Sequence, residues 1–174
     1  MSIAHCLENY LGVAQVSYNL ITHGHTESAY DSARSAHVPT ASVVKAVLLR
    51  SRGDGRYVLA LMPASNRLQL PWASRELEED LILAKEAELA DVFPDCETGA
   101  IPGFGQAYDM DLIWDDELSA QAELFFEAGD HEELIKIDQA EFQSLFGPYP
   151  HAGISLHHES YAQYHADEVR GRLH

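Results

Sequence analysis

The sequence predicts an α/β protein of the α+β type, with a mixed, mainly antiparallel sheet of about six or seven strands covered by helices. Six segments have the alternating or β-branched apolar pattern of strands, and helical patterns are interspersed among them. Short turns join several neighbouring strand segments, as in hairpins, which makes those strands antiparallel.

The chain of 174 residues is long enough for one domain that buries about two thirds of the surface its unfolded form would expose. No repeat, low-complexity tract or linker divides it, so we expect a single domain over residues 1–174. We place the core at about residues 25–146 and expect a polar, histidine-rich C-terminal segment over 147–174. Cys6 and Cys96 lack the spacing of a structural zinc site and are expected to be reduced, partly buried thiols.

The N-terminal part predicts a helix, a strand and a second helix. Apolar residues recur at helical spacing over 3–11, and Gly12 follows as a stop. Residues 16–20 alternate as in a strand. Small residues over 28–36 favour a second helix that ends before Pro39.

The clearest local pattern is a hairpin. Residues 42–50 and 56–62 are β-branched and apolar, and the intervening SRGDG contains Asp54-Gly55, which suits a tight turn. Both faces of the first run are apolar, so we expect this strand to lie in the centre of the sheet.

Residues 73–92 are rich in Ala, Leu, Glu and Lys and are compatible with one long helix. The sequence LILA within them is equally compatible with a short strand between two helices. Three further strands are predicted over residues 109–114, 122–127 and 133–137.

The last predicted element is a helix after the final strand. Asp138 and Glu141 form a capping-box pattern at its start, and Gly147-Pro148 ends it.

The charge is unevenly distributed. The net charge of −17 argues against a nucleic-acid partner, because phosphate binding requires Lys and Arg. Seven of the eleven basic residues nevertheless lie between Arg34 and Arg75 with one acid, Asp54, so this stretch carries +6 and the rest −23. Such a stretch could attract a short piece of nucleic acid, although charge alone favours the simpler explanation of ordinary surface arginines.

The longest apolar runs are strand-sized, far short of the ~18 residues that indicate a membrane span. The first ten residues also lack the charged start and apolar core of a signal peptide. We therefore expect a cytoplasmic protein without a membrane partner.

Lys45 is the most unusual single residue, because it shares a strand face with Val43, Val47 and Leu49. A lysine in such surroundings must pair, reach solvent or shift its pKa downward. A functional lysine and a sheet-edge lysine whose stem covers apolar surface both satisfy this pattern.

A glycine-rich segment, TGAIPGFG, spans residues 98–105. Its three glycines allow backbone conformations that other residues avoid and let a ligand approach the main chain. It matches neither GxxxxGK[ST] nor GxGxxG, so it is not a phosphate-binding loop of those kinds, and a structural turn is the alternative.

The remaining polar residues give weaker signals. The ten histidines form no recognisable ligand motif, so we expect neither metal nor cofactor and place His157, His158 and His165 in a solvated tail. Glu127 and His131 flank a turn and could meet a substrate at a strand end. No Ser-His-Asp or Cys-His arrangement is evident.

Several separated motifs occur in the order found in one known family. They are AHVPTASVVKAVLLR, a hairpin return ending in LALMPAS, LAKEAELADVFPDCETGAIPGFGQAY and FFEAGDHEELIKI. Over about residues 25–146 the chain resembles the YbaK/prolyl-tRNA synthetase-associated domain family. The resemblance implies a YbaK-like fold, in which LILA is a strand, and hydrolysis of mischarged aminoacyl-tRNA in trans.

The resemblance also implies roles for particular residues. Lys45 corresponds to the family's strand lysine, and the backbone of Gly99, Ala100 and Ile101 would share the catalytic work with it. The expected substrate-binding residues are Gly103, Phe104, Gly105, Glu127, His131, Arg50 and Arg52. The chain has Gly103 where family loops commonly have a proline, and Glu127 near the position where alanine-removing members often have a histidine.

The resemblance implies that the partner is the acceptor end of a tRNA carrying a small amino acid, with tRNA for proline as one candidate. Prolyl-tRNA synthetase is a further candidate partner. The alternative is a non-catalytic module that keeps the fold to sense a small ligand or a protein. The net charge of −17 and Gly103 support that alternative.

Overall fold

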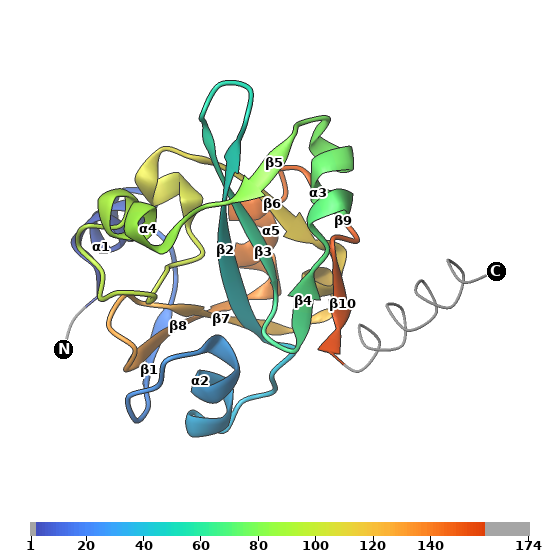
Figure 1. Cartoon of the computed structure of the whole chain (residues 1–174). Helices are drawn as coiled ribbons and strands as arrows, with labels where there is room; N and C mark the ends of the chain where they lie inside the picture. The colour runs from blue at the N-terminus through green and yellow to red at the C-terminus, as the bar shows by residue number, and fades with distance from the viewer. Residues whose placement is uncertain (1–2, 159–174) are drawn as a thin grey trace.

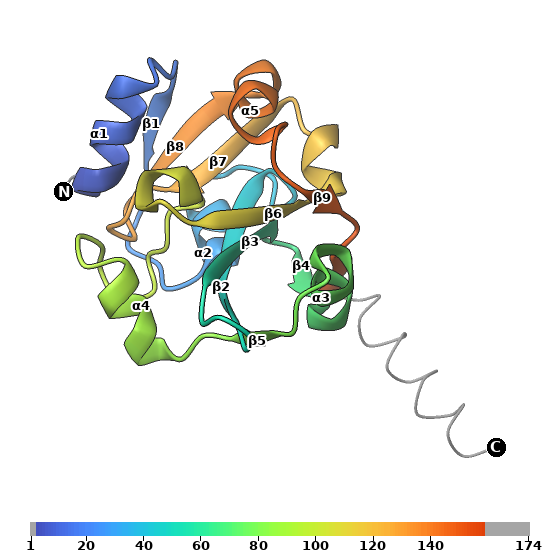
Figure 2. The ribbon, with the colours of Figure 1, turned by 90° about the horizontal axis from the view of Figure 1, so that it is seen from above.

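The computed structural model describes residues 3–158, which form a mixed eight-stranded sheet with helices on both faces and a separate two-stranded sheet (Figures 1 and 2). The eight-stranded sheet has the order β1-β8-β7-β2-β3-β6-β9, with β5 paired to one end of β2, and β4 and β10 form a separate pair. The strands are β1 (Asn19–Thr22), β2 (Val43–Ser51), β3 (Tyr57–Pro63), β4 (Asn66–Leu68), β5 (Leu81–Leu83), β6 (Asp111–Asp115), β7 (Glu123–Glu127), β8 (Glu133–Asp138), β9 (His151–Ala152) and β10 (Ser155–His157). The helices are α1 (His5–Val13), α2 (Ala29–Ser35), α3 (Leu70–Leu77), α4 (Glu86–Val92) and α5 (Gln139–Phe146), with 3₁₀ turns η1 (Gly105–Tyr108) and η2 (Asp116–Ala120).

One face of the sheet carries the largest hydrophobic cluster. Val44 and Leu48 of β2 pack there with Leu7 of α1 and Phe146 of α5, all of them buried. Figure 2 shows α1 and α5 together on this side of the sheet. The alternation of side chains along β2 therefore buries Val44 and Leu48 under these two helices.

The opposite face carries two separate clusters. Val43 packs with Ala33 of α2, and Leu49 packs with Ala73 of α3. Lys45 follows Val43 on this face by strand alternation. It therefore lies between the two clusters, beside the N-terminal part of α2.

The predicted hairpin is confirmed. Strands β2 and β3 pair antiparallel, and Gly55 adopts a φ of +76° in the turn that joins them. Strand β2 lies between β3 and β7, so its predicted central position is also confirmed. The sheet is mixed as expected, since β2 pairs parallel with β7 and β3 pairs parallel with β6.

Of the two alternatives for residues 73–92, one long helix is wrong, and the short strand between two helices, which the family resemblance also implies, is present. Helix α3 ends before Glu78, which has a left-handed φ of +53°. Residues 81–83 then pair antiparallel with the end of β2, and Leu81 is buried. Pairing and burial thus override the helical propensity of the local sequence.

Two predicted boundaries in the N-terminal part are also wrong. Gly12 lies inside α1, which continues to Val13. The predicted strand over 16–20 starts later, at Asn19, because the Val16 N–H donates to the Leu11 carbonyl and extends the helix end.

The strand predicted over 109–114 begins at Asp111. The 3₁₀ turn η1 precedes it, and Asp109 has a left-handed φ of +51° that interrupts the extended backbone. The predicted cap of the last helix is confirmed, since Asp138 Oδ1 accepts from the Glu141 N–H.

The expectation of a solvated tail from residue 147 is wrong for its first part. Strands β9 and β10 lie in this segment, and Ile154 between them is fully buried. Buried Asp115 fixes the segment by accepting from the Ile154 N–H at 3.0 Å and the Ser155 hydroxyl at 2.7 Å. The packed core therefore extends beyond residues 25–146. His165 lies outside the described residues.

Among residues 3–158, no helix has both the length and the apolar character needed to cross a membrane. Cys6 and Cys96 are free and partly buried, as expected.

Candidate functional site

A cavity of about 210 Å³ opens beside Lys45. Segments far apart in the sequence line it: α2 and the turn before it, strand β2, the glycine-rich loop and the ends of the β7–β8 pair. Its polar lining residues include Glu27, Lys45, Glu127 and His131. Glu27 and His131 lie more than a hundred positions apart in the sequence, and the fold brings them to the same cavity.

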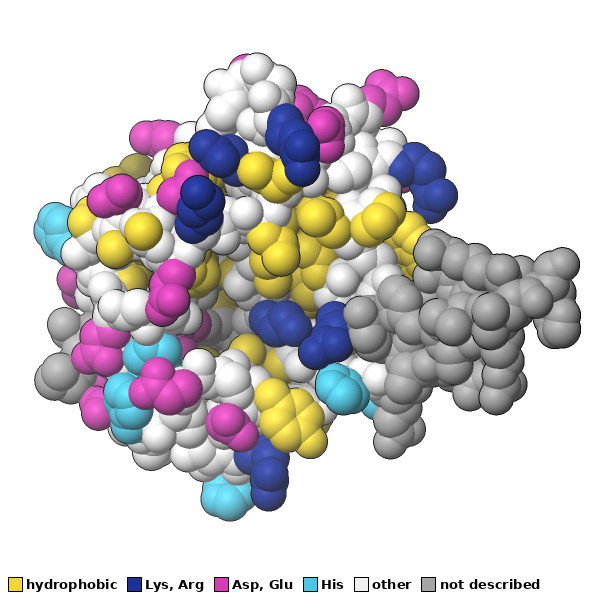
Figure 3. Space-filling model, viewed as in Figure 1, with side chains coloured by type: hydrophobic (Ala, Val, Ile, Leu, Met, Phe, Trp, Pro, Cys, Tyr) yellow, Lys and Arg dark blue, Asp and Glu magenta, His cyan; other side chains and the backbone are white. Residues whose placement is uncertain are grey.

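A second, larger cavity of about 540 Å³ lies next to the first, and the two share Ser28, Ala29 and Lys45. Strands β4 and β10 form its far wall with Arg67 and His157. Figure 3 shows dark blue basic side chains in the middle of this face of the molecule, at the hollow below a band of hydrophobic surface. Lys45 thus stands where the two cavities meet.

The side chain of Lys45 is half-buried and held in a defined position. Its Nζ donates to the Asn66 carbonyl at 2.8 Å, and the Asn66 amide in turn donates to Glu117 at 2.9 Å and Ser155 at 3.0 Å. Burial lowers the pKa of Lys45 below its ordinary value of 10.5, and repulsion by the Arg67 cation lowers it further. The fold therefore holds this ammonium at an energetic cost, which is typical of functional sites.

The lowered pKa of Lys45 predicts a specific pH dependence of stability. Between the lowered pKa and 10.5 the unfolded chain binds more protons than the folded chain at this residue, so its contribution to stability rises with pH. We expect the free energy of unfolding of wild type, minus that of Lys45→Met, to increase from pH 8 to pH 10. Urea denaturation at intervals across this range measures the difference, in which the titrations of other groups cancel. A difference that stays constant or falls would contradict the lowered pKa.

The glycine-rich loop contributes unequally to the site. Gly99 and Ile101 line the small cavity, and Gly99 has a φ of +82° that favours glycine. Ala100 is buried and its N–H donates to the Glu97 carbonyl at 3.0 Å. Of the three predicted backbone contributors, Gly99 and Ile101 are therefore the two at the cavity.

The second half of the loop packs into the core. Phe104 is fully buried, with its ring centroid 4.5 Å from that of Phe126. A Cβ on Gly103 would come within 2.8 Å of the Phe126 ring, and one on Gly105 within 3.3 Å of the Met110 carbonyl. Gly103, Phe104 and Gly105 do not line the small cavity. This half of the loop therefore faces the hydrophobic core. The Phe126 ring occupies the space that a proline at position 103 would need.

We expect Gly103→Ala to lower the free energy of unfolding by about 1–3 kcal/mol, because the added methyl group displaces a buried ring. Gly53→Ala in the β2–β3 turn is the matched control, since its Cβ would meet only the Ser51 hydroxyl at 3.5 Å. Urea denaturation of both variants measures the effect. Equal stability of the two variants would show that the loop has room at position 103.

Glu127 shapes the turn between β7 and β8. Its Oε1 accepts from the N–H groups of Gly129, Asp130 and His131 at 2.9, 3.1 and 3.1 Å. The turn needs this support because Gly129 and His131 have left-handed φ values of +115° and +61°. Glu127 therefore both stabilises the turn and lines the small cavity.

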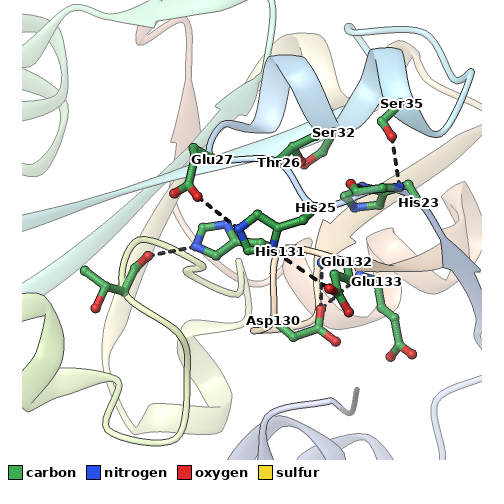
Figure 4. A network of polar contacts seen from close by, with 12 residues as sticks. His23, His25, Thr26, Glu27, Ser32, Ser35, Asp130, His131, Glu132 and Glu133 are labelled. Carbon is green, nitrogen blue, oxygen red and sulfur yellow. Dashed lines mark hydrogen bonds and ion pairs between the residues drawn. The ribbon is translucent and has the colours of Figure 1, made fainter.

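His131 ties this turn to the glycine-rich loop, as Figure 4 shows. Its Nε2 lies 2.7 Å from the Thr98 carbonyl, and because a carbonyl only accepts, Nε2 carries the hydrogen. The His25 ring lies 5.2 Å away, and a 2.9 Å contact with Glu27 raises the pKa of His25 above 6.5. The Glu27 side chain that holds His25 also lines the small cavity.

Arg50 and Arg52 lie toward the hairpin end of β2. Arg50 is within 3.5 Å of Glu88, and Arg52 is within 3.8 Å of Asp80. Neither arginine lines the two cavities, so a role in substrate binding would require contact with a part of the substrate outside them.

Sequence reasoning did not assign Glu27, Tyr30, Arg67 or His157 to the site. In the sequence Arg67 is one member of the basic stretch, and His157 falls in the segment expected to be a solvated tail. Their position depends on the pairing of β4 with β10, which no local pattern indicates.

No group of three or more His, Cys, Asp and Glu side chains that could hold a metal ion occurs within residues 3–158.

Solved structures share this fold. A crystal structure of a candidate trans-editing enzyme for prolyl tRNA synthetase superposes with a TM-score of 0.73, at 19% identity, covering 88% of this chain and 96% of that one. Hypothetical protein APE2540 gives a TM-score of 0.76 at 17% identity, covering 87% of this chain and all of the other. A candidate signal transduction protein from Marinobacter aquaeolei VT8 gives 0.69 at 14% identity, and the match covers 87% of this chain but 30% of that protein.

No curated protein matches the sequence. The family comparison is more informative. The model of the aminoacyl-tRNA editing domain family matches residues 23–145, well over half of the chain. The matched segment contains Lys45, the glycine-rich loop and the β7–β8 turn, which together line the small cavity. The chain therefore belongs to the aminoacyl-tRNA editing domain family.

Proposed function

We propose that this protein hydrolyses the ester bond of mischarged aminoacyl-tRNA as a trans-editing deacylase, with tRNA for proline as the first candidate. The observation that carries the proposal is the convergence of Lys45, Gly99, Ile101, Glu127 and His131 on one cavity. The similarity to a candidate trans-editing enzyme for prolyl tRNA synthetase supports the choice of tRNA.

The size and charge of the small cavity suit a small aminoacyl group. Its volume of about 210 Å³ is below the ~300–1,000 Å³ of typical drug-sized sites. Val43, Ala46, Ile101 and Leu134 offer apolar contacts for a short side chain. The carboxylates of Glu27 and Glu127 suit the positively charged α-amino group that every aminoacyl ester carries.

The chemistry requires orientation more than activation. Water attacks the ester carbonyl carbon, the carbon–oxygen bond to the ribose breaks, and the ribose oxygen takes a proton as the amino acid leaves. Backbone N–H groups at Gly99 and Ile101 are suited to stabilise the oxyanion that forms at the carbonyl oxygen. Lys45 would hold the tRNA end so that the ester lies beside this loop.

Such an activity has a physical purpose. One methylene group or small side chain changes the affinity of a synthetase for an amino acid by only about 1–3 kcal/mol, so charging errors occur. A second pocket that accepts only small aminoacyl groups removes the errors that the first cannot exclude.

The test is a panel of tRNAs charged with different small amino acids, several of them on tRNA for proline. We expect release of at least one amino acid at a rate above spontaneous hydrolysis, measured with labelled amino acid. Failure to release any member of the panel would reject the deacylase proposal.

A non-catalytic sensor is the second candidate, because a similar domain forms 30% of a candidate signal transduction protein. A sensor should bind a free amino acid or nucleotide and show a higher melting temperature with it, without binding tRNA. Salt-sensitive binding of tRNA would instead favour the enzyme.

A further inference from the structure

The ammonium of Lys45 is held by the main chain of a short strand. Its Nζ donates to the Asn66 carbonyl at 2.8 Å. Asn66 begins β4, a strand of three residues that pairs with β10 outside the eight-stranded sheet (Figure 1). Two short paired strands have little stability by themselves. The place of the Asn66 carbonyl, and with it that of Lys45, therefore depends on further contacts.

The side chain of Asn66 makes these contacts. Only 3% of the residue is exposed, and its amide nitrogen donates to Glu117 Oε2 at 2.9 Å and to Ser155 Oγ at 3.0 Å. Because a carboxylate oxygen only accepts, the amide nitrogen and not the amide oxygen must face Glu117. Both amide hydrogens are thereby used, so the orientation of the side chain is fixed.

Ser155 joins Asn66 to a buried carboxylate. Its hydroxyl donates to Asp115 Oδ2 at 2.7 Å, which leaves the hydroxyl oxygen to accept from the Asn66 amide. Asp115 is the last residue of β6, is 1% exposed and also accepts from the Ile154 N–H at 3.0 Å. A chain of hydrogen bonds thus links the carboxylate at the end of β6 to Lys45 through Ser155 and Asn66.

This chain of hydrogen bonds acts on Lys45 by geometry and not by charge. Burial and repulsion by Arg67 lower the pKa of Lys45, whereas a carboxylate close enough to act by charge would raise it. An ammonium has three N–H bonds at fixed angles to one another, and one of them points to the Asn66 carbonyl. Fixing this bond therefore also directs the other two, which remain for a ligand.

Part of this network lies outside the segment that defines the family. Ser155 is on β10, beyond the matched residues 23–145. Family membership alone therefore does not supply the contact that orients the Asn66 side chain.

We propose that Asp115, Ser155 and Asn66 are positioning residues. They place the Asn66 carbonyl so that Lys45 presents its ammonium to the tRNA end beside the glycine-rich loop. The proposal rests on the proposed deacylase function. Because these residues act through the position of Lys45 and leave its charge in place, their loss should lower kcat and leave KM nearly unchanged.

The first test measures the mobility of Lys45 in the full chain and requires no activity. The order parameter of the Lys45 Cε–H bonds, from ¹³C relaxation, should fall in Ser155→Ala to the value of the exposed Lys85. Ser155→Thr keeps the hydroxyl and should keep the wild-type value. Ser51→Ala is the matched control, since Ser51 is also buried and donates to a carboxylate at 2.7 Å, but lies at the hairpin end of β2.

The second test measures hydrolysis of a mischarged tRNA by the same variants. Ser155→Ala should lower kcat about tenfold, with KM within about twofold of wild type, because the ester is held in a less favourable orientation. Ser155→Thr should restore kcat to within about threefold of wild type. Ser51→Ala should leave both constants unchanged.

Several results would overturn the positioning role: an unchanged Lys45 order parameter in Ser155→Ala, an equal fall in Ser51→Ala, or a loss of kcat that Ser155→Thr does not restore. Hydrolysis by Ser155→Ala at the wild-type kcat rejects the positioning role and retains the deacylase. Release of Lys45 in Ser155→Ala, from a protein that hydrolyses no mischarged tRNA, retains the network around Lys45 and rejects the deacylase.

Discussion

Replacing Lys45 with methionine is expected to reduce kcat/KM for a mischarged tRNA by about 100-fold while leaving the fold intact. Lys45 stands at the junction of the two cavities, with Nζ fixed by the Asn66 carbonyl. Loss of a charge-assisted contact to the substrate costs about 1.5–3 kcal/mol, and misplacement of the ester beside the glycine-rich loop adds to it. Release of labelled amino acid under single-turnover conditions measures the loss.

Stability separates this effect from simple unfolding. Because burial lowers the pKa of Lys45, the folded protein disfavours its charged form, and an uncharged side chain of similar length avoids that cost. We therefore expect the melting temperature of Lys45→Met to equal or exceed that of wild type. Gain of stability with loss of activity is the pattern expected of a functional residue.

Lys136→Ala is the control for this experiment. Lys136 also lies on a strand of the sheet, but it pairs with Glu123 at 3.5 Å and lines neither cavity. Its activity should stay within about twofold of wild type, since exposed ion pairs contribute little. Wild-type rates in Lys45→Met would remove Lys45 from the site.

The elements that sequence predicts well are those fixed by local chemistry. The hairpin of β2 and β3 follows from two apolar runs around Asp54-Gly55, and the last helix starts at Asp138 because its carboxylate caps the Glu141 N–H. Lys45 was notable for the same reason, since a charged residue on an apolar strand is visible in the sequence. These features depend on neighbours within a few residues.

The elements that sequence misses depend on distant partners. Residues 81–83 are a strand because β2 provides an edge for Leu81 to Leu83, although the surrounding sequence favours a helix. The segment around Ile154 is ordered by Asp115 at the end of β6, which accepts hydrogen bonds from residues 39 and 40 positions further along the chain. A single sequence contains no local pattern for either contact.

The same distinction applies to the site. The small cavity consists largely of residues that family motifs indicate, such as Lys45, Gly99 and Glu127. The large cavity depends on the pairing of β4 with β10, in which Arg67 lies opposite Leu156. His157 lines this cavity only because the two strands pair. The sequence shows a basic stretch, but its charges do not indicate that Arg67 lines a cavity while Arg50 and Arg52 do not.

Glu127 is expected to have two separable roles, which Glu127→Ala and Glu127→Gln distinguish. Alanine removes the acceptor for three N–H groups of a turn that contains buried Asp130 and His131. We expect it to lower the free energy of unfolding by about 2–4 kcal/mol and to abolish activity. Glutamine keeps an acceptor oxygen, so its stability should lie within about 1 kcal/mol of wild type.

Activity of the glutamine variant then reports on the charge alone. If the Glu127 carboxylate binds the α-amino group of the substrate, Glu127→Gln should raise KM for a mischarged tRNA about tenfold, because a charged pair becomes a neutral contact. Glu123→Gln on the same strand is the matched control, since Glu123 is about half exposed and lines neither cavity. An unchanged KM in Glu127→Gln, together with an unstable alanine variant, would show that Glu127 only supports the turn. Recognition of the amino group would then fall to Glu27, the other carboxylate of the small cavity.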